Sequence, residues 1–319
     1  MKLVILDGYT ENPGDLSWDW LKELVDEYEV YDKTPAQLII ERARGAEIVV
    51  TNKTPLSKET LEKLPGLKYI STLATGYNVI DIDAASKLGI TVSNIPAYST
   101  DGVAQLVFAL LLEMTNRVAL HDKSVKDGEW ASCEHFCYWK TPLTELAGKT
   151  FGIIGFGKIG SAVAAIANAF RMKVIAYSPN TRSYDGFGSV DFLSLDEVIA
   201  SSDVISLHCP LTESTTGLVN TDFINKMKKG AYIINTSRGP VLNEADVRKA
   251  LDDGLLAGVG ADVLSTEPPK ADNPLATSDK TVVTPHIAWA SLEARTRLMN
   301  IFRSNVEGFV KGVPVNKVN

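Results

Sequence analysis

The sequence predicts an α/β protein built on parallel sheets, and three observations lead to this fold class. The 319 residues correspond to roughly two domains of about 150 residues. Short apolar runs alternate with helical stretches, which is the rhythm of β-α-β units. Runs such as Leu3–Leu6 and Ile48–Val50 are continuously apolar, as expected of parallel strands that are covered on both faces.

The alternation can be followed element by element in the first hundred residues. It passes through Leu3–Asp7, Trp18–Tyr28, Pro35–Arg44, Ile48–Thr51, Lys58–Leu64, Lys68–Leu73, Asp81–Leu88 and Ile90–Ser93. Within this series Trp18–Tyr28 is predicted to be helical. The spacing of apolar residues then predicts one long helix from Asp101 to about Lys126.

A second β-α-β series follows this helix. Its predicted strands are Thr150–Ile154, Lys173–Tyr177, Val204–Cys209, Ala231–Asn235, Leu256–Asp262 and Thr281–Thr284, with helices between them. Six strands in this order are typical of a doubly wound nucleotide-binding sheet.

Composition and charge exclude several classes of function. Lys and Arg number 32 against 39 Asp and Glu, a net charge of −7, so no basic excess is available for a nucleic-acid backbone. No apolar run reaches the roughly 18 to 20 residues that a bilayer requires. Cys133, Cys137 and Cys209 are an odd number, and Cys133, His135 and Cys137 match no usual zinc spacing. We expect a cytoplasmic protein without a metal site and without nucleic-acid or membrane partners.

A glycine-rich loop joins a predicted strand to a helix in the second series. Thr150–Ile154 runs into Gly155-Phe156-Gly157-Lys158-Ile159-Gly160, and an Ala-rich helix follows. In this G-x-G-x-x-G pattern Gly155 allows a tight turn, Gly157 lets the backbone approach a pyrophosphate and Gly160 lets helix and strand pack closely. The helix N-terminus then faces the anion. The loop predicts dinucleotide binding, and a tight turn without a ligand is the alternative.

The end of the next predicted strand lacks the acid that NAD-binding sheets usually carry there. The strand ends at Ser178, and Pro179, Asn180, Thr181 and Arg182 follow. Hydroxyl, amide and cationic groups suit the 2′-phosphate of NADP better than the ribose hydroxyls of NAD. We therefore expect NADP or NAD, with NADP favoured. Weaker NAD binding at Ser178, with Arg182 an ordinary exposed residue, is the alternative.

Three chemically active residues follow predicted strands. His286 follows Val282-Val283-Thr284-Pro285, Arg238 follows the strand that ends at Asn235, and Glu267 lies in the loop after Asp262. Ligands of doubly wound sheets bind at the carboxyl edge, so a base, a cation and an acid are expected there. Taken singly, each also has a purely structural interpretation, as a core, solvated or turn residue.

On these motifs the sequence resembles the D-isomer-specific 2-hydroxyacid dehydrogenase family over nearly its whole length. The resemblance rests on Gly155–Gly160, His208–Thr212, Asn235–Pro240, Asp262–Pro268 and Pro285–Ser291, and Asn52-Lys53 and Thr72–Asp81 agree with it. His286-Ile287-Ala288-Trp289-Ala290 looks like the hydroxypyruvate reductase (glycerate dehydrogenase) branch.

The resemblance implies a role for each catalytic residue. Arg238 would hold the substrate carboxylate and polarise its keto oxygen. His286 would be the general acid for reduction, and Glu267 would orient its ring and favour the protonated form. The expected cofactor contacts are Asp262 at the carboxamide, the backbone of Thr236 and Ser237, Ala288, and a wall of His208, Cys209, Pro210 and Thr215. The expected substrate contacts are Asn52, Lys53, Thr75, Gly76 and Trp289.

The resemblance also implies an architecture of two doubly wound parallel-sheet domains. A Rossmann cofactor domain, residues 101–290, would be inserted in a flavodoxin-like substrate domain, residues 1–100 and 291–319. Family members commonly dimerise through the cofactor domain. The aromatic segment with Trp130, Phe136, Tyr138 and Trp139 would then reach a partner, and Trp139 is the candidate to enter the neighbouring active site. A packed surface loop is the alternative.

The expected function is an NAD(P)-dependent oxidoreductase that reduces hydroxypyruvate or glyoxylate to the D-2-hydroxy acid. A dehydrogenase for another 2-keto acid is an alternative, because one methylene changes discrimination by only about 1 to 3 kcal/mol. A dinucleotide-sensing, corepressor-like protein is a second alternative. The complete set of Arg238, Glu267 and His286 argues against it.

Overall fold

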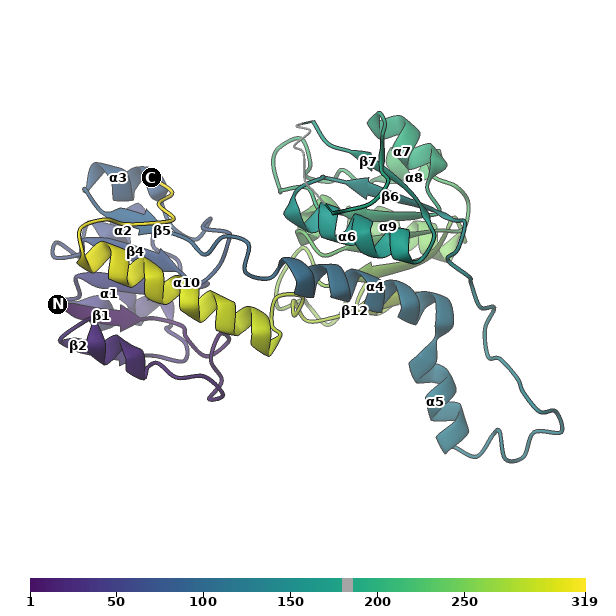
Figure 1. Cartoon of the computed structure of the whole chain (residues 1–319), viewed down its shortest axis with the longest axis horizontal. Helices are drawn as coiled ribbons and strands as arrows, with labels where there is room; N and C mark the ends of the chain where they lie inside the picture. The colour runs from purple at the N-terminus through teal and green to yellow at the C-terminus, as the bar shows by residue number, and fades with distance from the viewer. Residues whose placement is uncertain (180–185) are drawn as a thin grey trace. The chain divides into compact units, whose positions relative to one another are not determined.

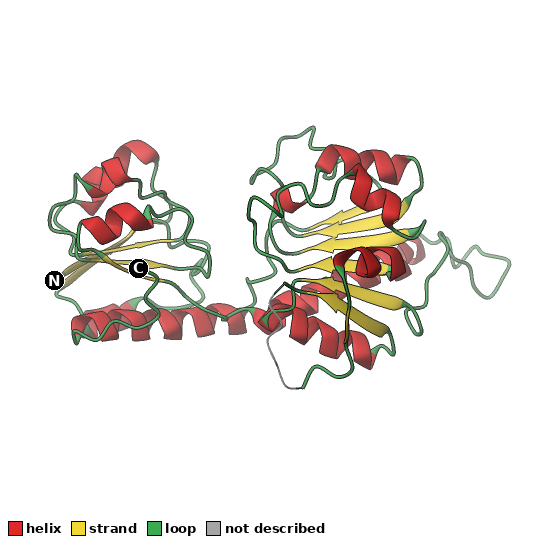
Figure 2. Cartoon of the chain, turned by 90° about the horizontal axis from the view of Figure 1, so that it is seen from above, coloured by secondary structure: helices red, strands yellow, loops and turns green. Residues whose placement is uncertain are grey.

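The computed structural model describes residues 1–179 and 186–319, which form two compact units (Figure 1). The first unit comprises Met1–Ser99 and Trp289–Asn319, and the second comprises Thr100–Ala288. Each unit is a parallel sheet with helices on both faces (Figure 2). The predicted fold class is therefore confirmed.

The first unit contains a five-stranded sheet in the order β2-β1-β3-β4-β5. Its strands are β1 Lys2–Ile5, β2 Glu27–Val30, β3 Ile48–Thr51, β4 Tyr69–Thr72 and β5 Thr91–Ser93, all paired in parallel. This is the flavodoxin-like order, in which the direction of chain progress reverses between β1 and β3.

Six helices surround this sheet, and the last returns from the end of the chain. They are η1 Asp19–Glu23, η2 Ala36–Leu38, α1 Ile39–Ala43, α2 Lys58–Leu61, α3 Ile82–Lys87 and α10 Leu292–Val310. Phe302 of α10 is fully buried against the edges of Trp18 and Trp20, and Phe309 stacks on Tyr69 of β4. Burial of these aromatic rings explains why the C-terminal segment rejoins the first unit.

The second unit contains a seven-stranded sheet in the order β12-β11-β10-β9-β6-β7-β8. Its strands are β6 Thr150–Ile154, β7 Lys173–Tyr177, β8 Asp191–Phe192, β9 Val204–Leu207, β10 Ala231–Asn235, β11 Leu256–Ala261 and β12 Thr281–Val283. Its helices are α4 Thr100–Asn116, α5 Val118–Lys126, α6 Lys158–Ala169, α7 Leu195–Ser201, α8 Thr221–Lys226, η3 Gly239–Val241 and α9 Glu244–Asp252. The order in which the chain adds strands to this sheet reverses between β6 and β9.

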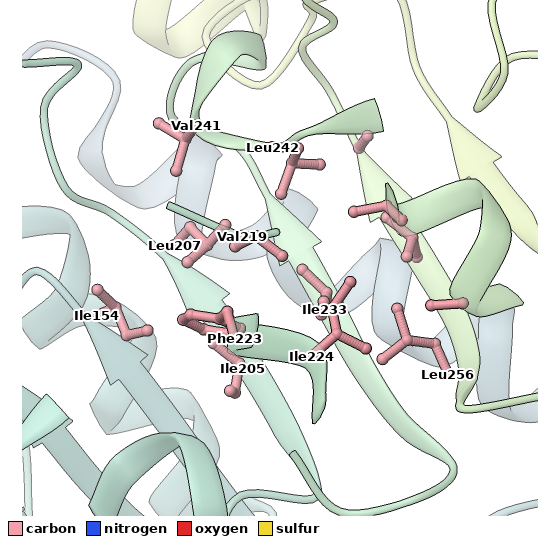
Figure 3. Close-up of a cluster of buried hydrophobic side chains, with 14 of the residues drawn as sticks. Ile154, Ile205, Leu207, Val219, Phe223, Ile224, Ile233, Val241, Leu242 and Leu256 are labelled. Carbon is pink, nitrogen blue, oxygen red and sulfur yellow. The ribbon is translucent and has the colours of Figure 1, made fainter. Parts of the chain in front are cut away.

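The continuously apolar strands of this sheet bury residues on both faces. Ile205 and Leu207 of β9 pack with Phe223 of α8 on one face (Figure 3), whereas Val204 packs in the cluster beneath α4 and α6. Successive side chains of a strand point to opposite faces, so an all-apolar strand requires helices on both.

The structure corrects three expected elements. Trp18–Tyr28 is not a helix: it contains the short 3-10 helix η1, and β2 begins at its end. The alternating Glu-Tyr-Glu-Val sequence of β2 suits an edge strand. Glu29 of β2 pairs with Lys2 of the neighbouring strand β1 at 2.5 Å. The sheet of the second unit also has the short strand β8, which adds a seventh strand to the six expected.

The third correction concerns the expected long helix from Asp101 to Lys126. Arg117 adopts a left-handed backbone conformation with φ 50°, so α4 and α5 are separate helices bent by 55°. The apolar stripe of α4 is buried, whereas Val118 and Val125 of α5 are exposed. Beyond Arg117 the helix therefore has no sheet to pack on.

Among the described residues, no single helix is long and apolar enough to cross a membrane. Only α4 and α5 taken together, across their bend, meet a test of length and composition.

Candidate active site

The glycine-rich loop lies at the reversal point of the seven-stranded sheet. Gly155 has φ +97°, and a Cβ there would stand 2.6 Å from the backbone of His208 and Cys209. A Cβ on Gly160 would stand 2.5 Å from the carbonyl oxygen of Gly155. Both glycines are therefore required by close backbone packing between β6, α6 and the end of β9.

Gly157 differs from these two glycines because a Cβ at that position would meet no protein atom within 4 Å. Gly157 is the N-cap of α6, so it adjoins the backbone N–H groups that begin this 12-residue helix. The hydroxyl of Thr236 is also buried without a hydrogen-bond partner. An unpaired buried hydroxyl costs about 1 to 3 kcal/mol, so both features fit a dinucleotide better than an empty turn.

The predicted wall after β9 is shaped by burial. Desolvation lowers the pKa of His208 to about 4, and its Nε2 lies 2.9 Å from the hydroxyl of Ser206. Burial raises the pKa of the Cys209 thiol. Thr215 donates to the carbonyl of Pro210 at 2.6 Å, which closes the turn beyond them. These residues are uncharged near neutral pH, so the wall is a neutral surface.

The cofactor-specificity segment is described only in part. Ser178 follows β7 and is half-buried. The predicted contacts Asn180, Thr181 and Arg182 lie outside the described residues.

Arg238 stands on a loop that a buried amide holds in place. Asn235, the last residue of β10, accepts from the backbone N–H and hydroxyl of Ser237 and donates to the carbonyl of Arg238. A Cβ on Gly239 would lie 1.9 Å from the backbone of Leu264, so the loops after β10 and β11 touch at this point. The guanidinium of Arg238 is exposed above this contact.

Glu267 and His286 meet at the same edge of the sheet. Oε2 of Glu267 lies 2.6 Å from Nδ1 of His286, and its Oε1 accepts from the backbone N–H of Leu264 at 3.2 Å. His286 adopts φ +56°, a region that few residues other than glycine occupy. The pairing leaves Nε2 of the imidazole as the nitrogen directed away from Glu267.

Asp262 fixes the backbone on both sides of His286. One of its oxygens accepts from the Thr284 hydroxyl and the Ile287 N–H, and the other from the Ala288 N–H, at 2.6 to 2.8 Å. Three such bonds hold the histidine loop in its left-handed turn. The predicted contact of Asp262 with the cofactor carboxamide stays a prediction.

In the first unit, Asn52 and Lys53 follow β3 at the reversal point of the five-stranded sheet. Asp7, which follows β1, accepts from the backbone N–H groups of Asn52, Lys53 and Thr54 at 2.6 to 2.8 Å. This clamp leaves the Lys53 side chain exposed and the Asn52 side chain buried.

The other predicted substrate residues of the first unit are Thr75, Gly76 and Trp289. Thr75 follows β4, where its hydroxyl donates to Ile95 and its carbonyl accepts from Asn94, both at 2.8 Å. Trp289 stands edge-on to Tyr98 with ring centroids 6.4 Å apart.

Several residues shape the site although the sequence predicted no role for their side chains. Asp7 and Asn235 each end or follow an apolar strand, and that position was the available signal. Glu244 accepts from the Ser265 N–H at 2.7 Å and from the Asn273 amide at 2.8 Å, which braces the Glu267 loop. No local pattern marks Glu244, because its partners are more than 20 residues away.

Known proteins resemble this chain in sequence and in structure. The family described as D-isomer specific 2-hydroxyacid dehydrogenase, NAD binding domain, matches residues 108–288. The chain belongs to this family. It is 48% identical to the hydroxypyruvate reductase of Blautia hydrogenotrophica over 322 aligned residues, which cover all of both chains.

Two further similarities place this D-2-hydroxyacid dehydrogenase among enzymes. It is 41% identical to the glycerate dehydrogenase of Methylorubrum extorquens over 295 residues, or 92% of each chain. A solved structure of an acyclic imino acid reductase in complex with NADPH and D-Arg matches all of both chains with a TM-score of 0.87 and 33% identity. The predicted family is confirmed, and two relatives bear the names of the branch that the motifs resemble.

The described part of the dehydrogenase places no three His, Cys, Asp or Glu side chains where they would hold a metal ion. The three cysteines are free thiols.

Gly157→Ala should separate cofactor binding from folding. The new methyl group meets no protein atom within 4 Å but occupies the space predicted for the pyrophosphate. We expect an unchanged melting temperature and cofactor binding weaker by about tenfold or more, measured by fluorescence titration with NADH and NADPH. Gly155→Ala, which clashes with backbone, should instead lower the melting temperature. Unchanged affinity in the Gly157 variant would contradict the assignment.

Proposed function

We propose that this dehydrogenase reduces hydroxypyruvate or glyoxylate to the D-2-hydroxy acid with NADPH or NADH. The observation that carries the proposal is the Glu267–His286 pair at 2.6 Å, at the edge of the sheet where the loop of Arg238 touches the loop of Glu267. An acid, its orienting partner and a cation together are what reduction of a 2-keto acid requires. The names of the two relatives support the substrate class.

Each residue of this group then has a distinct task. Arg238 binds the substrate carboxylate through the paired, planar hydrogen bonds of its guanidinium. Protonated His286 donates its proton to the keto oxygen as that oxygen gains negative charge. Glu267 keeps the ring oriented and stabilises its positive charge. A bound nicotinamide supplies the hydride.

The first unit would act as the substrate domain, residues 1–100 with 291–319, and residues 101–290 as the dinucleotide-binding domain. The proposed substrate contacts are Asn52, Lys53, Thr75 and Gly76, together with Trp289, which belongs to the first compact unit although it lies just before the proposed boundary at residue 291. The carboxyl edge of the five-stranded sheet supports this assignment, because Asn52 and Lys53 follow β3 there, and Thr75 and Gly76 follow β4. Free thiols support action in a reducing compartment such as the cytoplasm.

His286→Ala tests the proposed acid. Without a proton donor, turnover should fall by roughly 100- to 10,000-fold while cofactor affinity is kept. The measurement is NADH or NADPH consumption with hydroxypyruvate, glyoxylate and a panel of larger 2-keto acids. His135→Ala makes the same change at an exposed position and should retain full turnover. A loss of tenfold or less would refute the role of His286, and consumption only with larger acids would refute the proposed substrates.

We also propose that the enzyme uses NADPH in preference to NADH. No carboxylate follows β7 at Ser178, so the usual repulsion of a 2′-phosphate is missing there. The structural neighbour in complex with NADPH supports this choice.

Ser178→Asp should reverse that preference. The added carboxylate would accept hydrogen bonds from the ribose hydroxyls of NADH and repel the phosphate of NADPH, changing the ratio of kcat/KM values by about tenfold or more. Ser189→Asp adds the same charge at an exposed position of the same unit and should leave the ratio unchanged. A tenfold preference for NADH in the unaltered enzyme would rule out the proposal.

A homodimer through the second unit is the proposed assembly. Helix α5 and the segment after it extend away from the seven-stranded sheet (Figure 1) and expose Phe136 by 89% and Trp139 by 67%. A groove of about 720 Å³ runs along this arm between Val118 and Leu143. Exposed aromatic side chains beside a groove are typical of a protein interface, and a second copy would cover both.

Phe136→Ser with Trp139→Ser should weaken this dimer. Removing the two exposed anchors should raise its dissociation constant by about tenfold or more, measured by sedimentation velocity over a concentration series. Val313→Ser, which also removes an exposed apolar side chain but from the first unit, should have no effect. A monomeric unaltered enzyme at micromolar concentration would contradict the assembly.

A further inference from the structure

The five-stranded sheet buries a carboxyl group at its reversal point that no step of the proposed reaction uses. Glu11 lies in the loop after β1 and is fully buried. Its Oε1 accepts from the side-chain amide of Asn52 at 2.5 Å and from the hydroxyl of Thr10 at 2.9 Å. Its Oε2 is buried and has no hydrogen-bond partner. An ionised carboxylate normally has both oxygens hydrogen-bonded or paired with a cation when buried.

The charged groups around Glu11 do not neutralise it. Asp7 from the loop after β1 repels a negative charge, and Lys53 after β3 attracts it more weakly. Arg295 of α10 donates to the backbone carbonyl of Glu11, while its own guanidinium is paired with Asp15 at 2.6 Å. The carboxyl therefore faces one competing acid, one exposed lysine and one cation that is already paired.

From this geometry we propose that Glu11 is a positioning residue that must carry a proton to hold Asn52 and Lys53 in the arrangement that binds the 2-keto acid. A neutral carboxyl keeps the Asn52 amide fixed without placing a negative charge beside an anionic substrate. Ionised Glu11 would repel the substrate carboxylate and weaken its binding. The inference rests on the proposed function, because it takes Asn52 and Lys53 as substrate contacts.

The electrostatics agree with this geometry. Desolvation, assisted by Asp7, raises the pKa of Glu11 to about 8. The folded protein thus holds a proton on Glu11 across the neutral range, whereas an unfolded chain loses it near pH 4.5. The stability contributed by this proton is complete below pH 4.5 and is lost as the pH rises to about 8.

Glu11→Gln tests the proposal, because glutamine has the shape of the protonated acid but cannot ionise. We expect the KM ratio for hydroxypyruvate, unaltered enzyme over variant, to be near 1 at pH 6.5 and to reach about 10 at pH 9. Any pH effect that is common to both proteins cancels in this ratio. Glu41→Gln, the same change at an exposed residue of the first unit, should behave as the unaltered enzyme.

A second variant keeps the test decisive if Glu11→Gln does not fold. The Thr10 hydroxyl lowers the pKa of Glu11, and Thr10 is exposed, so Thr10→Val should fold and shift the alkaline rise in KM to higher pH. The inference would be overturned if the ratio of KM values for the unaltered enzyme and Glu11→Gln did not change with pH. It would also be overturned if KM of Thr10→Val rose at the same pH as KM of the unaltered enzyme. No turnover of any 2-keto acid by the unaltered enzyme would instead overturn the proposed function. In that case, infrared difference spectra of the unaltered protein and Glu11→Gln still decide whether Glu11 is protonated at pH 6.5.

Discussion

Parallel pairing of the strands is the constraint from which the rest of this structure follows. Every strand pair among the described residues is parallel, so each sheet gathers all the residues that follow its strands at a single edge. Arg238, Asp262 and His286 follow three neighbouring strands and reach one edge of the second sheet. A single antiparallel strand among these would carry its residue to the opposite edge. Chemistry that needs several groups at once therefore depends on the direction of the strands before it depends on any side chain.

Both units stabilise these strand ends with the same device. Asp7 and Asp262 each follow a strand, and each uses both carboxylate oxygens to accept hydrogen bonds from the end of the neighbouring strand. Backbone N–H groups at a strand end have lost their partners in the ladder, and an ionised acceptor satisfies two or three of them together. Residues 52–54 and 284–288 are fixed in this way. A loop held by charge-assisted bonds keeps its shape without a regular element to support it.

A feature of this protein could be predicted from the sequence where neighbouring residues encode it, and could not where it depends on distant contacts. The glycine loop, most of the strands and the positions of the three proposed catalytic residues were predictable, because each is encoded by neighbouring residues with a period or spacing of their own. Strand β2 was missed because an edge strand with two glutamates resembles an exposed helix. The break at Arg117 was missed because the apolar pattern continues into α5 although no sheet lies beneath it. Glu11 carried no signal, since acidic residues are almost always exposed and only the folded loop shows its burial.

Exposure also separates the residues that are proposed to react from those that hold them in place. Arg238 is exposed, and the side chains of His286 and Glu267 are exposed by 28% and 38%. Asp262 and Glu11 are buried. A group that exchanges a proton or binds an anion must be reachable, and its charge is tolerable there because solvent screens it. A group that fixes a loop gains strength from burial, provided that its own charge is fully paired. Asp262 meets that condition with three donors, whereas Glu11 has donors on one oxygen only, and a proton is the least disruptive way for it to remain buried.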